Sequence, residues 1–184
     1  MTIPGILIVS APSGAGKTSL ARALVSENNQ VGLTVSHTTR PIRPGEIGGV
    51  HYHFIDRQEF EKMIEQDMFV EYASVFDHYY GTSVAAIRQQ LDTGKHAILD
   101  IDWQGARKVR GKFPNAVSVF IMPPSLEALE QRLRDRGQDS EEVIARRMGD
   151  ARSEISHKDE YDFTIVNDDF DRALSQLNGM LASL

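Results

Sequence analysis

The sequence predicts an α/β fold: a parallel sheet covered on both faces by helices, with a mixed α/β insert and a helical lid attached to it. Three observations support this prediction. Short apolar runs of strand length alternate with amphipathic stretches of helix length. The runs are almost continuously apolar, which is typical of parallel strands buried on both faces. A length of 184 residues, with 41% hydrophobic and 25% charged residues, suits a single globular domain.

The core of the sheet is predicted from residues 1–36, 93–125 and 158–184. Its first strand is Ile6–Ser10, and a glycine-rich turn leads from it into a helix over about residues 18–27. The second core helix is expected over about residues 104–112. The remaining core strands are expected at Leu33–Ser36, His96–Ile101, Ala116–Ile121 and Phe163–Val166.

Residues 37–92 are predicted to form the insert, whose first part is rich in Pro, Gly and Arg. Asp56, followed three residues later by Glu59, predicts a capping box that opens a helix to about Gln66. Ser83 is expected to cap a second helix, which ends before Gly94. The strands of the insert are expected at residues 52–55, 69–75 and 79–82, paired antiparallel.

Residues 126–157 are predicted to form a helical lid. This segment is dense in arginine, although the chain as a whole carries a net charge of -6. Its arginines are Arg132, Arg134, Arg136, Arg146, Arg147 and Arg152. So many guanidinium groups on one helical segment of an acidic protein predict a local clamp for anions.

Composition excludes several classes of protein. The chain has 20 basic and 26 acidic side chains, whereas a protein that neutralises a nucleic-acid backbone usually has the opposite balance. It has no cysteine, which excludes disulfides and thiolate sites and fits a reducing compartment. No apolar run approaches the ~20 residues of a membrane span, and no basic residues precede the first one as in a signal peptide. We therefore expect a cytoplasmic protein without nucleic-acid or membrane partners; the sequence carries no signal for its oligomeric state.

A phosphate-binding loop follows the first predicted strand directly. The residues from Ala11 to Thr18 read Ala-Pro-Ser-Gly-Ala-Gly-Lys-Thr, a Walker A loop with alanine in place of its usual first glycine. Its backbone N–H groups and the N-terminus of the next helix would converge on phosphate oxygens. Lys17 is expected to reach the β- and γ-phosphates, and the Thr18 hydroxyl to ligate Mg²⁺. The predicted ATP-binding residues here are Ala11, Pro12, Ser13, Gly14, Ala15, Gly16, Lys17, Thr18 and Ser19.

A second anion site is predicted where Arg40 and Arg43 lie in a turn stiffened by Pro41 and Pro44. Two arginines three residues apart can present two planar forks to one phosphate group. The Walker A loop predicts a nucleoside triphosphate, and this turn predicts a second phosphorylated molecule that receives its phosphate.

Several stretches together resemble the guanylate kinase family. Around the arginine turn these are Ser36–Glu46, Tyr52, Glu71 and Tyr80-Gly81-Thr82. The further stretches are Ile98–Gly105, Arg132–Gly137 and Ile165–Asp169, which follow in the order of the family. The resemblance extends from about Leu7 to Asp171, nearly the whole chain.

The resemblance implies phosphoryl transfer from ATP to GMP, with Mg²⁺ as cofactor, and it implies a role for individual residues. The GMP phosphate would be held by Arg40, Arg43, Tyr52 and Tyr80. The guanine base would be recognised by Ser36, Glu71 and Thr82. Asp100 would orient Mg²⁺-bound water, Asp102 would touch the nucleoside or the metal shell, and Asn167 would lie near the adenosine of ATP. The residues that would act on the transferring phosphoryl group are Lys17, Arg40, Arg132, Arg136 and Arg147.

Three alternatives remain open from the residues themselves. The chain could phosphorylate another nucleoside monophosphate, bind phosphorylated peptides as a guanylate-kinase-like interaction module, or hydrolyse ATP without an acceptor. Glu71 favours guanine, and the intact Lys17-Thr18 pair favours an enzyme over a binding module. No catalytic-base signature is found, and none is needed, because a phosphate monoester with a second pKa near ~6 is already mostly dianionic at neutral pH.

Overall fold

A five-stranded parallel sheet forms the centre of the protein. The computed structural model describes residues 4–75, 77–135, 137 and 139–184. Within them the strand order is β2-β7-β1-β8-β9, and each neighbouring pair runs parallel. The strands are β1 (Ile6–Ser10), β2 (Val31–Leu33), β7 (His96–Asp100), β8 (Val117–Met122) and β9 (Phe163–Val166). The predicted α/β fold with a parallel core is confirmed.

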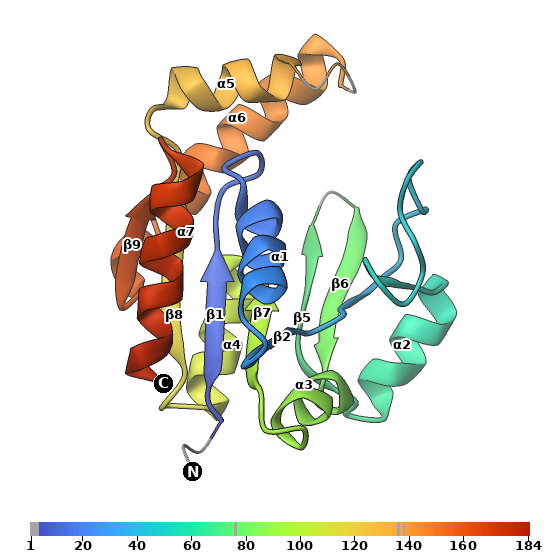
Figure 1. The fold of residues 1–184 in the computed structure, drawn as a ribbon. Coiled ribbons are helices and arrows are strands. Elements are labelled where there is room, and N and C mark those ends of the chain that lie inside the picture. Colours follow the sequence, from blue (N-terminus) through green and yellow to red (C-terminus); the bar gives the residue numbers. More distant parts are fainter. Residues whose placement is uncertain (1–3, 76, 136, 138) are drawn as a thin grey trace.

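Helices cover both faces of this sheet (Figure 1). They are α1 (Lys17–Glu27), α3 (Val84–Leu91), α4 (Trp103–Lys112) and α7 (Phe170–Gly179), with the short 3₁₀ turns η1 (Lys158–Glu160) and η2 (Met180–Ser183). Leu7 and Val9 of β1 pack with the side chains of α1 and α7. Ile6 and Ile8 of the same strand pack on the other face with those of α3 and α4. Because side chains alternate along a strand, one continuous apolar run fills both cores.

The insert contains a second sheet of order β4-β3-β6-β5. Its elements are β3 (His37–Thr38), β4 (His53–Phe54), α2 (Arg57–Glu65), β5 (Phe69–Val75) and β6 (His78–Ser83). It has a small core of its own, in which Phe60 stacks on Phe69 with ring centroids 4.5 Å apart. The predicted helix starts are confirmed: Asp56 accepts from the Glu59 N–H at 2.7 Å, and Ser83 accepts from the Ala86 N–H at 3.1 Å.

Two predictions about the strands need correction. The strand expected at Leu33–Ser36 is wrong, since β2 covers Val31–Leu33 and the chain then crosses from the central sheet to the insert. The carbonyl of Ser36 already accepts from the His53 N–H of the insert at 2.8 Å. The insert is also not purely antiparallel, because β3 and β4 pair in parallel while β6 pairs antiparallel with β3 and β5. A short apolar stretch does not specify which sheet it joins or in which direction.

The lid segment is helical, as predicted, and consists of α5 (Leu126–Asp135) and α6 (Glu141–Ile155). The two helices share a small apolar core that includes Leu129, Leu133 and Ile144. They lie across the end of the sheet at which β1 leads into α1 (Figure 1). In the described part of the chain, no helix combines the length and the apolar character that crossing a bilayer requires.

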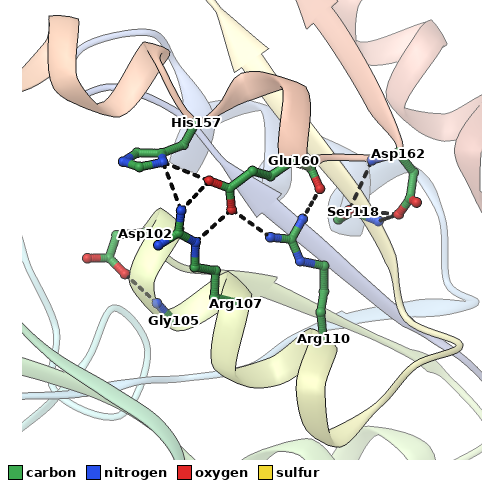
Figure 2. A network of polar contacts seen from close by, with 8 residues as sticks. All are labelled: Asp102, Gly105, Arg107, Arg110, Ser118, His157, Glu160 and Asp162. Carbon is green, nitrogen blue, oxygen red and sulfur yellow. Dashed lines mark hydrogen bonds and ion pairs between the residues drawn. The ribbon is translucent and has the colours of Figure 1, made fainter.

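A polar network joins η1 and His157, which follow α6, to α4 (Figure 2). Its centre is the Glu160 carboxylate, which accepts from Arg107 Nε at 2.7 Å and from Arg110 Nη2 at 3.2 Å. The His157 ring lies within hydrogen-bonding distance of Glu160 and stacks on Trp103 at 3.8 Å. The hydrogen bond from Arg107 lowers the pKa of Glu160 to about 2, so this carboxylate is charged at neutral pH. The lid is therefore anchored to α4, the helix whose N-cap residue Asp102 lines the cavity of the candidate active site.

Candidate active site

A cavity of about 280 Å³ lies at the carboxyl ends of β1 and β7, where open α/β sheets bind their ligands. Four parts of the chain contribute to its lining: the glycine-rich loop before α1, the insert, the end of β7 and the lid helix α6. The sequence-predicted residues that line it are Ala11, Pro12, Ser13, Gly14, Gly16, Lys17, Thr18, Ser19, Ser36, Arg43, Tyr52, Glu71, Tyr80, Asp100, Asp102 and Arg147. Ala15, Arg40, Thr82, Arg132 and Asn167 are not part of this lining, and Arg40 lines a second cavity on the insert. Arg136 lies outside the described residues.

The phosphate loop needs its glycines for conformation and for space. Gly14 and Gly16 have φ values of 95° and 94°, in the left-handed region that other residues rarely adopt. Gly16 is also the N-cap of α1. A Cβ added there would lie 2.4 Å from Nδ2 of Asn167, whose side-chain amide donates to the Ala15 carbonyl at 2.8 Å. Asn167 thus supports the backbone of the loop at Ala15.

The Lys17 ammonium is held at the floor of the cavity by the end of β7. Its Nζ lies 2.5 Å from Asp100 Oδ1 and donates to the Ile101 carbonyl at 3.3 Å. Burial acts to lower the pKa of Lys17, but the charge and hydrogen bond of Asp100 outweigh it and hold that pKa above its usual value. Lys17 is therefore a fixed positive charge at neutral pH.

The residues expected to serve Mg²⁺ lie together. The Thr18 hydroxyl donates to Asp100 Oδ2 at 2.7 Å, and Asp102 lines the same cavity. Hydroxyl and carboxylate oxygens are the hard ligands that Mg²⁺ prefers. Over the described residues there is no group of three or more His, Cys, Asp or Glu side chains that could hold a metal by itself. This donor set fits an ion that keeps several waters and takes further oxygens from a bound nucleotide.

On the insert side of the cavity, the buried Glu71 carboxylate provides hydrogen-bond acceptors. An irregularity in the β5–β6 pairing between Phe69 and Glu71 places three successive residues of β5 in the interior. Glu71 is only 4% exposed, and its carboxylate lies so close to Gly105 that a Cβ there would be 2.6 Å from Oε2. Burial raises the pKa of Glu71 to about 7, although hydrogen bonding to Thr82 acts against it.

Two hydroxyl groups complete this part of the site. The Ser36 and Thr82 oxygens lie 3.2 Å apart, and both residues are buried. A carboxylate can only accept hydrogen bonds, whereas a hydroxyl can donate as well as accept. Glu71, Ser36 and Thr82 therefore offer acceptors and donors side by side, as a flat heterocycle with both kinds of group on its edge requires.

The two arginines of the proline-flanked turn have different surroundings. Arg43 lines the cavity together with Tyr52 and Tyr80, whose rings meet edge to face at 5.9 Å. Arg40 is 9% exposed and forms two hydrogen bonds with Glu46, at 3.0 and 2.8 Å. The sequence predicted that both guanidinium groups would face one phosphate, and the fold gives that of Arg40 a carboxylate partner within the protein.

The lid contributes charges of both signs. Arg147 of α6 lines the cavity and lies 3.1 Å from Asp139 Oδ2. Arg132 of α5 donates to the Asn167 carbonyl at 2.8 Å, beside the phosphate loop. Arg147 is therefore paired within the lid while it lines the cavity, and Arg132 contacts the segment that supports the phosphate loop.

Two acidic residues at the site were missed in the sequence. Glu154 of α6 lines the cavity, and its Oε2 accepts from the Ser13 N–H of the phosphate loop at 3.3 Å. Burial raises the pKa of Glu154 to about 7. It follows Arg147 by seven residues, a spacing that puts both on one helix face and could have drawn attention to it. Glu46 is the second, and only its position three residues after Arg43 hinted at a role.

Comparison with known proteins gives a consistent result over nearly the whole chain. The family model described as Guanylate kinase matches residues 4–184. The chain is 57% identical over 182 residues to the guanylate kinase of Alkalilimnicola ehrlichii, covering 98% of this chain and 90% of that one. It is 59% identical over 181 residues to that of Methylococcus capsulatus, covering 98% and 89%. The crystal structure of guanylate kinase from Anaplasma phagocytophilum matches with a TM-score of 0.83 at 34% identity, covering 99% of this chain and 86% of that one.

Proposed function

This chain belongs to the guanylate kinase family and catalyses the ATP-dependent phosphorylation of GMP to GDP, and from that premise we propose which of its residues carry out each step. The observation that carries the proposal is that the phosphate loop with Lys17 and the buried Glu71 line the same cavity. One end suits the phosphates of ATP and the other suits a base with adjacent donors. The three alternatives weighed from the sequence lose their support, because the relatives that match nearly the whole chain are guanylate kinases.

On the ATP side, the loop from Ala11 to Thr18 binds the phosphates through its backbone N–H groups and the N-terminus of α1. Lys17, fixed by Asp100, stabilises the charge that develops between the β- and γ-phosphates. Thr18 would ligate Mg²⁺ directly and Asp100 through a bound water. When bound, the ion neutralises negative charge on the phosphate oxygens and orients them.

On the GMP side, Glu71 accepts the two donors on one edge of guanine, while Ser36 and Thr82 serve the O6 atom. The phosphate is held by Arg40, Arg43, Tyr52 and Tyr80. Asp102 is the N-cap of α4 and accepts from the Gly105 N–H at 2.8 Å, so it is fixed where the two nucleotides meet. These side chains orient a GMP oxygen toward the γ-phosphorus.

The transfer itself needs positioning and charge neutralisation more than a catalytic base. An oxygen of the GMP phosphate forms the new bond to the γ-phosphorus as the bond to the β–γ bridging oxygen breaks, which leaves ADP and GDP. Arg132, Arg136 and Arg147 of the lid would approach the transferring group and help to exclude water, since water in the acceptor position would hydrolyse ATP.

Arg43→Lys is expected to weaken GMP binding with little effect on ATP. A lysine keeps the charge but cannot reproduce the two-pronged contact of a guanidinium with a phosphate. We expect the KM for GMP to rise by about 10-fold or more, with the KM for ATP nearly unchanged, in steady-state assays that vary each nucleotide in turn. Equal increases in the two KM values would contradict a specific role in GMP binding.

Asp100→Asn is expected to raise the Mg²⁺ concentration that half-maximal activity requires. The amide keeps the shape of the side chain but loses the charge that orients Lys17 and Thr18. Outer-shell carboxylates of this kind typically contribute about 10- to 100-fold to metal affinity or activity. A Mg²⁺ titration at fixed ATP and GMP measures the shift, and an unchanged midpoint would remove Asp100 from the metal site.

We also keep as proposals the cytoplasmic location, which the cysteine-free composition favours, and the absence of nucleic-acid and membrane partners. We further propose that the chain divides into a core, a GMP-binding insert at residues 37–92 and a lid at residues 126–157, and the positions of the second sheet and of α5 and α6 support this division.

A further inference from the structure

Glu46 is a half-buried acidic residue beside the two arginines proposed to hold the GMP phosphate, and none of the proposed roles includes it. It follows a turn in which Gly45 has a φ of 83° and the Glu46 N–H donates to the Arg43 carbonyl at 3.0 Å. This turn brings the Glu46 carboxylate back toward both arginines. Its Oε2 accepts from the Arg43 N–H at 2.7 Å, and its two oxygens together meet the Arg40 guanidinium.

The hydrogen bonds of Arg40 divide its guanidinium into two edges. Nη1 donates to the Pro41 carbonyl at 2.7 Å and to Glu46 Oε2 at 3.0 Å, and Nη2 donates to Glu46 Oε1 at 2.8 Å. A guanidinium has five N–H donors. These contacts engage three of them and leave the Nε–H and the second Nη2–H, which point from the same edge of the planar group. Glu46 therefore takes the end of the guanidinium and not its side fork, and the Tyr80 hydroxyl is a further hydrogen-bonding partner of Arg40.

Arg40 is also restrained by its surroundings. Its Cζ lies 5.5 Å from the centre of the Tyr52 ring and 5.7 Å from that of Phe54. Burial acts to lower the pKa of Arg40, but the hydrogen bond to Glu46 and the nearby Tyr80 phenol raise it overall, so the group stays charged. The hydrogen bond from Arg40 in turn lowers the pKa of Glu46. Both partners are ionised at neutral pH, and the pair keeps one geometry.

We propose that Glu46 is a positioning residue for GMP: it holds the end of Arg40 and the backbone of Arg43 so that the side fork of Arg40 and the guanidinium of Arg43 face one phosphate group. This rests on the proposed roles of Arg40 and Arg43. Glu46 then has two effects on phosphate binding. Its negative charge by itself would weaken the binding of a phosphate, whereas its orientation of the two arginines strengthens that binding by more. Because these two effects change GMP affinity in opposite directions, the sign of the change in a Glu46 variant shows which of them is larger.

Glu46→Gln is the test, with equilibrium binding of GMP and of guanosine measured by calorimetry. The amide replaces one carboxylate oxygen with a donor that faces a guanidinium donor, so the two-pronged contact is lost. We expect GMP to bind about 10-fold or more weakly, and guanosine, which lacks the phosphate, to bind as in the wild type. The KM for GMP should rise by a similar factor, while the KM for ATP and kcat stay within about twofold. Tighter or unchanged GMP binding would overturn the proposal.

Two further variants distinguish positioning from a general loss of structure. Glu61→Gln removes the exposed 3.0 Å pair with Arg57 on the same insert and should leave GMP binding unchanged. In an Arg40→Lys background, Glu46→Gln should have a much smaller effect than in the wild type, because the group through which it acts is gone. Fully additive losses, or a parallel rise in the KM for ATP, would show that Glu46 supports the fold instead.

Glu46→Asp keeps the test decisive if the glutamine variant melts at a lower temperature. Aspartate retains the charge but is one methylene shorter, so it cannot reach Arg40 and the Arg43 N–H together, and we expect intermediate GMP affinity. If aspartate binds GMP as well as wild type, charge and not geometry matters, and the proposal fails. Failure of the proposed function is distinct, because it would appear in the wild type as an inability to phosphorylate GMP.

Discussion

Lys17→Ala should retain the fold and lose at least about 100-fold in kcat, the loss typical of removing one preorganised group that stabilises transition-state charge. That factor corresponds to about 2.7 kcal/mol of transition-state stabilisation. The reason is that Lys17 is surrounded by acidic residues. Asp100 is 2.5 Å from its ammonium, and Asp102 and Glu154 line the same cavity. Without the Lys17 ammonium, the negative charge of the triphosphate would face these acidic side chains with one positive charge fewer to offset the repulsion.

The measurement is steady-state turnover with both nucleotides saturating, together with thermal unfolding. Lys62→Ala, on the exposed side of α2, is a matched control that should leave kcat unchanged. Near-normal kcat in a folded Lys17→Ala protein would contradict the role of the phosphate loop in catalysis. A rise in the KM for ATP with kcat intact would contradict it as well, since it would place the effect of Lys17 in ground-state binding.

The second large effect is the preference among bases, which we expect to follow the order GMP, IMP, AMP in kcat/KM. Guanine presents N1–H and a 2-amino group to the Glu71 carboxylate, while hypoxanthine lacks the 2-amino donor. Adenine turns a lone pair at N1 toward the carboxylate and puts an amino group where Ser36 and Thr82 meet an oxygen. A site built on polar pairing rejects such a base by up to about 10⁴-fold, because its own buried groups are left unpaired.

Glu71→Gln should shrink the advantage of GMP over IMP, because an amide oxygen is a weaker acceptor than a carboxylate. An acceptor panel in a coupled assay measures both effects. Glu65→Gln, an exposed position on α2, is the control. If AMP is as good an acceptor as GMP, Glu71 does not recognise the base.

The raised pKa of Glu71 adds a pH dependence with a defined sign. Burial raises this pKa to about 7, so below that pH the empty site holds a protonated carboxyl, and GMP must displace the proton to find two acceptors. We expect the affinity for GMP to fall as the pH drops from 8 to 6. Part of this fall comes from the GMP phosphate itself, whose second pKa is near ~6. The component due to Glu71 is the part that disappears in Glu71→Gln.

Much of the fold was predictable because its signals are local. Three of these signals adjoin in sequence: the apolar run of β1, the glycine-rich turn and the start of α1. The conformation of each depends on residues that are close to it in the chain. The same holds for the helix starts at Asp56 and Ser83, where a side chain caps an N–H three residues away. The Walker A loop is local as well, which is why Lys17 and Thr18 could be assigned from the sequence alone.

The direction of Glu71 could not be predicted in this way. It stands between apolar neighbours in a strand, where an acidic residue usually faces solvent. An irregularity in the pairing of β5 with β6, and the missing side chain at Gly105, are what place it inside. Both depend on residues distant in the chain, and register is set by the partner strand rather than by the strand's own composition.

By itself, then, the sequence determined the α/β class, the phosphate loop and, through resemblance to a family, the reaction. The tertiary structure decided what each charged side chain meets. It gave Arg40 a carboxylate partner while Arg43 faces the cavity, and it brought Glu154 of the lid onto the phosphate loop. It also ended the second core strand at Leu33, where the sequence predicted a strand over Leu33–Ser36. The reason is physical: a helix start or a loop depends on contacts within a few residues, whereas the pairing and burial of a charge depend on which distant segments the packed core brings together.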